Sequence, residues 1–495
     1  MANEAIYTAC LKTGVHRVIT GNDLLVYVSS PFAFYCDQFV AKEERDPISN
    51  YLRTLMDRGR QHETTTVEED YPEAVNVEFV TEEEGFRKTL EMMSEGQPSI
   101  YNMPLIYLPE GMKGRPDLLQ RVDGYDTRFG SYGYEVIEIK SAKNIREKHE
   151  AQTAFYTRLL GQVQGATPEE FHIINGEGNL STYNYRDFDQ WLDDVLSDLY
   201  RVIEGEAVDA CYGSCPWPWE TYGHRIAIEM KDVSLIPGVG PSSQAALKDA
   251  GFTTVAVVAG ASPDALLVVR GIGAAKAAKF HTKALSIISG KITPRRPEAL
   301  DFTEHKHELF LDLEGTDPRF NTDGLAITNY LIGMLIREGT QVTYRPFFAE
   351  SLDKEAEILE EFCQFLSSMK DYVLYHWHSY ERTHLNKMLN NYGLDTKYES
   401  VIFDHMVDLS PITTKAFAFP TYSDGLKAIA KSLGFNWRQD DVDALESVYL
   451  YALYIDSGSK DTDVKGRILT YNEDDCIATM HIKDWLAAQS ETASK

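Results

Sequence analysis

The sequence has few cysteines, no long apolar run and too few basic residues to balance its acidic ones. Six cysteines scattered through 495 residues do not form a disulfide framework, which agrees with a reducing compartment. No apolar run approaches the ~18 residues of a membrane span, and the N-terminus MANEAIYTACLKTG lacks the basic start and apolar stretch of a secretory signal. We therefore expect a cytoplasmic protein with no membrane partner.

The shortage of basic residues limits how the chain binds nucleic acid. With 48 basic and 76 acidic residues the formal net charge is -28. Repulsion from phosphates opposes wholesale nonspecific adhesion at this charge, although it does not exclude local binding. Carboxylates gathered around divalent metals account for only a small part of the acidic excess, and the rest has no explanation in the sequence.

Length and composition indicate a globular α/β protein of about two to four domains. Helical and strand patterns are mixed over residues 1–225, whereas residues 226–292 form small-residue helical segments punctuated by glycine. The stretch 292–300 carries two prolines and no periodicity, so we expect a linker there. Strands then alternate with longer helices over residues 300–495, as in an α/β domain.

The strand pattern YEVIEIK places Glu138 and Lys140 on one face and Ile137 and Ile139 on the other. A bare Glu-x-Lys is usually an ion pair on an edge strand. Here, however, the preceding LLQRVDGYD and the GSYGY turn predict a hairpin that brings Asp123 beside Glu138 and Lys140. Two carboxylates suit Mg²⁺ or Mn²⁺, and an adjacent lysine orients water or stabilises charge on phosphorus. The set is suited to hydrolysis of phosphodiesters.

This pattern resembles the D...(D/E)-x-K signature of the PD-(D/E)XK nucleases. Two more motifs are similar to the RecB-like branch: Gly59 and His62 in RGRQHE, and Gln152 and Tyr156 in AQTAFY, which share one helix face. The resemblance implies a restriction-endonuclease-like domain with metal ligands His62, Asp123 and Glu138 and catalytic residues Lys140, Gln152 and Tyr156.

RecB-like exonucleases often hold an iron-sulfur cluster with one cysteine before the nuclease core and three after it. This chain has Cys36, then only Cys211 and Cys215, with Cys10 as a further candidate. The C-x₃-C spacing without a third downstream cysteine departs from that pattern. We expect ordinary buried or free thiols, and a cluster at Cys36, Cys211 and Cys215 stays the alternative.

The middle region repeats a Gly-apolar-Gly motif followed by a small-residue helix. The glycines are Gly238 and Gly240 in the first copy and Gly271 and Gly273 in the second. Such turns bring backbone N–H groups and a helix N-terminus close to an anion. The motif resembles tandem helix-hairpin-helix modules, which bind DNA without reading bases. Lys276 supports phosphate contact in the second copy, whereas the first has few basic residues, and a role as protein–protein spacer stays open.

Three motifs follow in the C-terminal region. LFLDLEGTD places Asp312 and Glu314 on one strand face, and Tyr471 and Asp475 lie four apart on a late helix. Between them YHWHSYERTHL carries Glu381 after a strand. Alone, Asp-x-Glu is often an ordinary acidic turn, but this order resembles the DEDD exonucleases of the RNase H-like fold, which hold two metals with four acidic residues.

The resemblance implies metal ligands Asp312, Glu314, Glu381 and Asp475, with Tyr471 positioning the attacking water. The second motif departs from the family, because Glu381 stands where Asp is usual. That change leaves either an altered or a weakened site.

The whole chain resembles a group of predicted RecB-family nucleases in which these three modules are fused. The resemblance implies a Mg- or Mn-dependent nuclease, an exodeoxyribonuclease with a RecB-like site and a second 3′ to 5′ exonuclease-type site, in DNA repair, recombination or defence. One alternative is an adaptor that binds branched or single-stranded nucleic acid with one or both sites inactive. Another is a C-terminal domain that acts on RNA.

Overall fold

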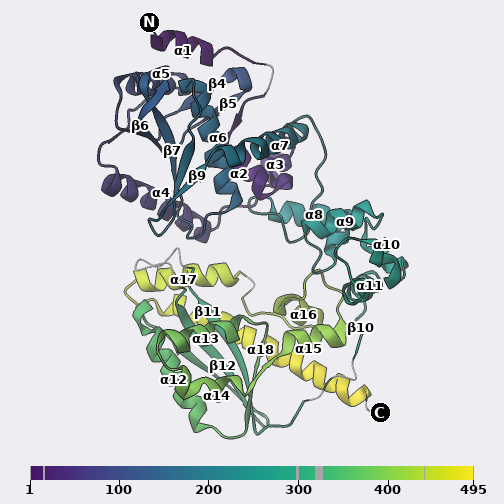
Figure 1. The fold of residues 1–495 in the computed structure, drawn as a ribbon. Helices are drawn as coiled ribbons and strands as arrows, with labels where there is room; N and C mark the ends of the chain where they lie inside the picture. The colour runs from purple at the N-terminus through teal and green to yellow at the C-terminus, as the bar shows by residue number, and fades with distance from the viewer. Residues whose placement is uncertain are drawn as a thin grey trace. The chain divides into compact units, whose positions relative to one another are not determined.

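The computed structural model describes residues 2–14, 17–296, 300, 302–317, 327–439 and 441–493 (Figure 1). The chain divides into two compact units. The first comprises the described residues up to Ala210 together with Ser214–Gly223. The second comprises Cys211–Gly213 and the described residues from His224 onward. None of the described helices combines the length and apolar character that a membrane crossing requires.

A six-stranded sheet in the order β2-β3-β6-β7-β8-β9 forms the centre of the first unit. Its strands are β2 (Ala74–Val75), β3 (Ser99–Tyr101), β6 (Leu118–Thr127), β7 (Gly130–Ile139), β8 (Glu170–Ile174) and β9 (Leu180–Asn184). The predicted hairpin is the antiparallel pair β6 and β7, and β7 pairs with β8 in parallel. Because β7 lies inside the sheet, the alternative of an edge-strand ion pair at Glu138 and Lys140 is wrong.

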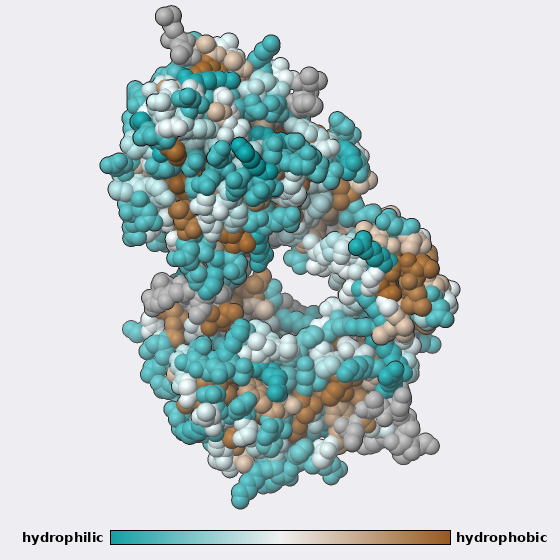
Figure 2. Space-filling model, viewed as in Figure 1, coloured by the Kyte–Doolittle hydropathy of each residue, from teal (hydrophilic) through white to brown (hydrophobic). Residues whose placement is uncertain are grey.

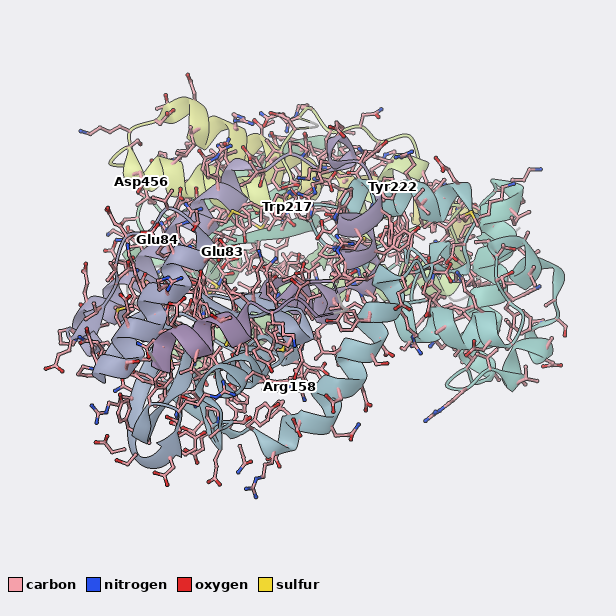
Figure 3. All side chains as sticks on the ribbon, turned by 90° about the horizontal axis from the view of Figure 1, so that it is seen from above. Glu83, Glu84, Arg158, Trp217, Tyr222 and Asp456 are labelled. Carbon is pink, nitrogen blue, oxygen red and sulfur yellow. The ribbon has the colours of Figure 1, made fainter. Side chains whose placement is uncertain are left out.

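A small sheet and seven α-helices are further elements among the described residues of this unit. They are β1 (Ile19–Thr20), β4 (Leu105–Tyr107) and β5 (Met112–Gly114), with α1 (Ala2–Cys10), α2 (Gly21–Ser29), α3 (Pro31–Phe39), α4 (Asn50–Asp70), α5 (Glu82–Glu95), α6 (Glu147–Gln164) and α7 (Arg186–Ile203). The crossover helix α6 is buried along most of its length because its sequence is rich in small and apolar residues. Arg158, which Figure 3 labels, belongs to α6. It forms ion pairs with Asp189 and Asp193 of α7.

The second unit begins with helical segments, one of which is bonded to the buried carboxylate of Asp232. These are α8 (Glu220–Glu229), which starts in the first unit, then α9 (Pro241–Asp249), α10 (Val255–Gly260) and α11 (Ala274–Ser289). The Asp232 carboxylate accepts from Ser234 N at 2.8 Å and Gln244 Nε2 at 2.7 Å, and pairs with Lys248 Nζ at 2.6 Å. Hydrophobic residues gather on the surface around α10 (Figure 2), where Val257 is exposed.

A five-stranded mixed sheet in the order β13-β12-β11-β14-β15 forms the centre of the rest of this unit. Its strands are β11 (His307–Gly315), β12 (Asn329–Glu338), β13 (Gln341–Phe348), β14 (Tyr372–His376) and β15 (Met406–Asp408). Strand β11 pairs antiparallel with β12 and parallel with β14. The helices are α12 (Glu355–Ser368), α13 (Tyr380–Asn391), α14 (Asp395–Phe403), α15 (Leu409–Ala416), α16 (Leu426–Ser432), α17 (Ala444–Asp456) and α18 (Thr462–Ala493). The long helix α18 packs against β11 and β12.

The segment 292–300, expected as a linker, is partly tied down. Thr293–Pro294 forms β10, which pairs antiparallel with β16 (Phe417–Ala418). The Arg295 guanidinium donates to the Thr414 carbonyl oxygen at 2.6 Å. Residues 297–299 lie outside the described residues. Part of the expected linker is therefore a short strand. The sequence did not indicate this strand, because two paired residues are too few to show a periodicity.

Candidate functional site

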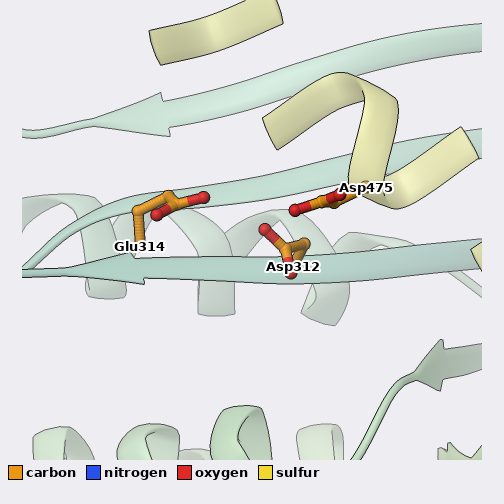
Figure 4. A group of neighbouring side chains, drawn as sticks. All are labelled: Asp312, Glu314 and Asp475. Carbon is orange, nitrogen blue, oxygen red and sulfur yellow. The ribbon is translucent and has the colours of Figure 1, made fainter. Parts of the chain in front are cut away.

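Three carboxylates meet where the central strand β11 faces helix α18 (Figure 4). Asp312 and Glu314 project from the same face of β11, because side chains two apart on a strand share a face. Asp475 comes from α18. One carboxylate oxygen of each residue lies within 4.8 Å of the others. The sequence-predicted residues Asp312, Glu314 and Asp475 are thus brought together.

Neighbouring side chains hold two of these carboxylates in place. Asn472 Nδ2 donates to Asp312 Oδ2 at 2.6 Å, and the Tyr344 hydroxyl donates to Asn472 Oδ1 at 2.8 Å. Trp437 Nε1 donates to Asp475 Oδ1 at 2.7 Å. Partners of this kind orient ligating side chains in metal sites. Asn472 and Trp437 belong to no motif in the sequence and were not predicted.

Burial raises the pKa values of all three carboxyl groups, and repulsion within the cluster raises those of Asp312 and Glu314 further. Burial, followed by the charge of Asp475, raises the pKa of Glu314 to about 8. Burial raises the pKa of Asp475 to about 6. For Asp312, burial and then the charges of Asp475 and Glu314 raise the pKa well above its usual value. Crowded carboxylates of this kind either keep protons or are neutralised by a cation. A buried set of hard oxygen donors fits Mg²⁺ or Mn²⁺.

Of the two other predicted residues of this centre, Tyr471 lies beside Asp475, whereas Glu381 lies outside the carboxylate group. Tyr471 is buried one turn before Asp475 on α18 and hydrogen bonds to it. Burial, together with the Asp475 charge, raises the pKa of Tyr471 far above its usual value, so its hydroxyl stays protonated. Glu381 is buried in the first turn of α13, but it is not in the carboxylate group, and its Oε2 lies 3.4 Å from His376 Nδ1. The structure therefore assembles three of the four predicted ligands.

Lys427, which no motif indicated, lies beside this centre. It belongs to α16, and its Nζ lies 4.6 Å from the centroid of the Tyr471 ring and 5.9 Å from that of Trp437. Its charge lowers the pKa values of all three clustered carboxyl groups, against the effect of burial. Only the long-range fold brings a residue some fifty positions before Asp475 to this point, so sequence spacing carries no signal for it.

In the first unit the predicted residues Glu138 and Lys140 lie together at one site, whereas the predicted residue Asp123 lies away from it. In the hairpin Asp123 pairs opposite Tyr132, near the turn, whereas Glu138 lies toward the far end of β7. The Asp123 side chain is 78% exposed and pairs with Arg121 at 2.8 Å. The placement of Asp123 beside Glu138 is therefore wrong, because the register separates the two along the hairpin.

Asp117, immediately before β6, takes the expected position. Its Oδ2 accepts from Ile139 N at 2.7 Å and lies 3.8 Å from Lys140 Nζ. Its backbone N donates to Glu138 Oε1 at 2.9 Å, and Lys140 Nζ donates to Glu138 Oε2 at 2.5 Å. Burial and the Asp117 charge raise the pKa of Glu138 to about 7 against the effect of Lys140. Although burial opposes its charge, Lys140 has a raised pKa because Glu138 and Asp117 stabilise the ammonium.

The remaining predicted residues of the first unit are Tyr156, Gln152 and His62. Tyr156 is buried and hydrogen bonds to Gln152. Burial, followed by the charges of Glu138 and Asp117, raises the pKa of its hydroxyl. Its ring fills the space that a side chain at Gly114 would occupy. His62 Nε2 and Gln152 Oε1 are buried with no partner among the described residues. His62 does not form a close ligand group with the two carboxylates, in contrast to the C-terminal centre. The two carboxylates, Asp117 and Glu138, fit a hydrated divalent ion.

The Gly-apolar-Gly motifs form the turns that precede α9 and α11. Gly238 and Gly271 have φ of 91° and 80°, which side chains rarely adopt. Gly240 and Gly273 occupy the N-cap positions of α9 and α11. Lys276 Nζ lies 3.5 Å from Ser243 Oγ of the first copy. The lysine is thus positioned beside residues of both copies.

The cysteines of the iron-sulfur alternative are divided between the units. Cys36 and Cys215 are buried in the first unit, and Cys211 is buried in the second, where its Sγ lies 3.9 Å from the Val239 carbonyl oxygen. Over the described residues, the one close group of metal-ligating side chains contains no cysteine. The iron-sulfur alternative therefore stays a prediction.

Comparison with known families agrees with the second unit. Residues 309–487 match the family described as the RNase_H superfamily, and residues 230–280 match the one described as the SAM-like helix-hairpin-helix tandem. No curated protein matches the chain. The chain therefore carries an RNase H superfamily domain with a carboxylate cluster and a helix-hairpin-helix domain, which together indicate a nuclease acting on nucleic acid. Both matches lie in the second unit, so the PD-(D/E)XK fold of the first stays a prediction.

Proposed function

We propose that this chain is a divalent-metal-dependent nuclease whose C-terminal centre removes nucleotides from the 3′ ends of DNA. The observation that carries the proposal is the group Asp312, Glu314 and Asp475, whose oxygens lie within 4.8 Å of one another in an RNase H superfamily domain. The tandem helix-hairpin-helix domain supports nucleic acid as the substrate. A role in DNA repair, recombination or defence fits such an activity.

In this proposal some residues of the C-terminal centre bind the metal and others orient the residues that bind it. Asp312, Glu314 and Asp475 would hold the metal, which activates water and supports the leaving oxygen in sites of this kind. Asn472 and Trp437 fix the orientation of the carboxylates. The protonated Tyr471 hydroxyl, next to Asp475, is available to hydrogen bond the attacking water. Gly238 and Gly271 free the turns whose backbone N–H groups would hold phosphates of the strand.

A second nuclease site of the RecB-like type is part of the same proposal. It consists of Asp117, Glu138 and Lys140, with Gln152 and Tyr156 beside them. The 2.5 Å contact of Lys140 with Glu138 and its 3.8 Å distance from Asp117 support a lysine that is fixed next to two ligating carboxylates. When a metal occupies the carboxylates, this ammonium is positioned to stabilise negative charge on phosphorus.

Degradation of end-labelled substrates tests both sites. Wild-type protein, a Lys140→Ala variant and an Asp312→Asn, Asp475→Asn variant are incubated with Mg²⁺ or Mn²⁺ and with single-stranded DNA, duplex DNA or RNA. We expect Lys140→Ala to retain 3′ trimming and the double Asn variant to lose it by about 10² to 10³-fold. Failure of the wild type to cleave any substrate refutes the nuclease function. Loss of all cleavage in Lys140→Ala alone refutes an active C-terminal centre, and faster trimming of RNA than DNA reassigns its substrate.

A further inference from the structure

Lys427 occupies an unusual position for a lysine beside acidic residues. Among the described residues its ammonium makes one hydrogen bond, to the Val442 carbonyl oxygen at 3.3 Å, and no ion pair. It lies instead over the rings of Tyr471 and Trp437. Lysine has three N–H donors, so this arrangement leaves donors for a further partner.

The two rings that position Lys427 are the same ones that contact Asp475. Trp437 Nε1 donates to Asp475 Oδ1 at 2.7 Å, and Tyr471 hydrogen bonds to Asp475. The aromatic rings therefore fix the ammonium at the edge of the carboxylate group through cation–π contacts. At the first-unit site, by contrast, Lys140 bonds directly to Glu138.

We propose that Lys427 is a catalytic residue of the C-terminal centre and binds a non-bridging oxygen of the phosphate that is cleaved. The proposal rests on the nuclease function proposed above. A lysine that served only to neutralise the carboxylates would be expected in an ion pair with them, whereas one fixed by aromatic rings keeps its donors for an incoming anion. A fixed cation beside phosphorus stabilises the charge that develops in the transition state.

If the Lys427 ammonium binds the phosphate, its charge has opposite effects on the affinity for the metal and on the affinity for the substrate strand. Removing it takes away repulsion toward a divalent ion, so metal affinity should stay equal or rise. Affinity for the strand and the rate of cleavage should fall. A lysine with a purely structural role would instead weaken metal binding and folding together when it is replaced.

The test compares Lys427→Met, Lys427→Arg and Lys431→Met, each combined with Lys140→Ala so that cleavage reports the C-terminal centre. Lys431 is the matched control, because it lies on the same helix with its Nζ also 5.9 Å from the Trp437 ring centroid. Calorimetry measures Mn²⁺ affinity, and the isotherm that disappears in the Asp312→Asn, Asp475→Asn variant identifies the centre. Anisotropy measures binding of a labelled single-stranded oligonucleotide in Ca²⁺.

We expect Lys427→Met to bind Mn²⁺ at least as tightly as its parent, to bind the oligonucleotide several-fold more weakly and to cleave about 10²-fold more slowly. Lys427→Arg should recover part of the rate, and Lys431→Met should stay within about threefold of the parent. Unchanged cleavage by Lys427→Met in an active parent overturns the role of Lys427, as does a loss of Mn²⁺ affinity. An inactive wild type refutes the nuclease function itself, and unchanged oligonucleotide affinity in Lys427→Met then also refutes the phosphate contact.

Discussion

Asp117→Asn and Asp123→Asn are a matched pair of changes that tests the corrected site of the first unit. Both replace a carboxylate by an amide of the same shape, Asp117 immediately before β6 and Asp123 within it. Asp117 contacts Ile139 N and lies 3.8 Å from Lys140 Nζ, whereas Asp123 is a surface residue bonded to Arg121. We expect only the first change to affect cleavage.

The size of each effect follows from these surroundings. An amide oxygen at position 117 still accepts the Ile139 N–H, so Asp117→Asn should cost no more than about 1 kcal/mol of folding free energy. It removes a negative charge beside Lys140 and a hard ligand, which should cost about 10² to 10³-fold in rate. The pKa of Glu138, now about 7 because of burial and the Asp117 charge, should fall. The pair of Asp123 with Arg121 is exposed and contributes about 0–1 kcal/mol, so its loss should leave the rate within about threefold.

The assay uses the Asp312→Asn, Asp475→Asn background, in which the C-terminal centre is silent. Initial rates on labelled single-stranded DNA in Mn²⁺ are compared with thermal unfolding of the same samples. If Asp123→Asn abolishes cleavage while Asp117→Asn leaves it intact and both proteins stay folded, the observed hairpin register does not describe the active state. If both variants keep the full rate, the first unit does not contain the nuclease site.

Three further predictions concern the second unit. Burial raises the pKa of Glu314 to about 8 and that of Asp475 to about 6, so a metal must displace protons from these carboxyl groups. Affinity for Mn²⁺ should therefore fall as the pH is lowered from about 8 to about 6. Calorimetry that shows the same affinity at both pH values contradicts this prediction. Converting Gly238 and Gly271 to valine forces side chains into positive φ and should weaken DNA binding at low salt about tenfold without reducing Mn²⁺ affinity, as anisotropy can measure. Trp437→Phe removes the donor to Asp475 and should weaken Mn²⁺ binding about tenfold in calorimetry, and an unchanged affinity shows that this hydrogen bond does not orient the ligand.

Local geometry explains which parts of the sites were visible in the sequence. Asp312 and Glu314 are two apart on a strand, and Tyr471 and Asp475 are four apart on a helix, so the period of each element fixes their common face. The choice of Asp123 instead of Asp117 failed on register. Regular pairing from the Thr127–Gly130 pair at the turn would place Asp123 opposite Tyr134, whereas a register shift between Asp123 and Thr127 places it opposite Tyr132. In either register Asp123 lies opposite a residue well before Glu138. The Pro-Asp dipeptide at Asp117 was the neglected signal.

The two acidic sites differ in whether the sequence indicates the basic residue beside the carboxylates. Lys140 is two residues from Glu138 on one strand, so the alternation that places the acid also places the base. Lys427 reaches Asp475 only through the packing of α16 against α18 and the rings of Trp437 and Tyr471. No period in the sequence relates these residues, since their proximity depends on tertiary contacts alone. A carboxylate group found by motif should therefore prompt a search of the structure for a basic side chain fixed nearby, because such a side chain stabilises the charge of a bound phosphate wherever in the chain it originates.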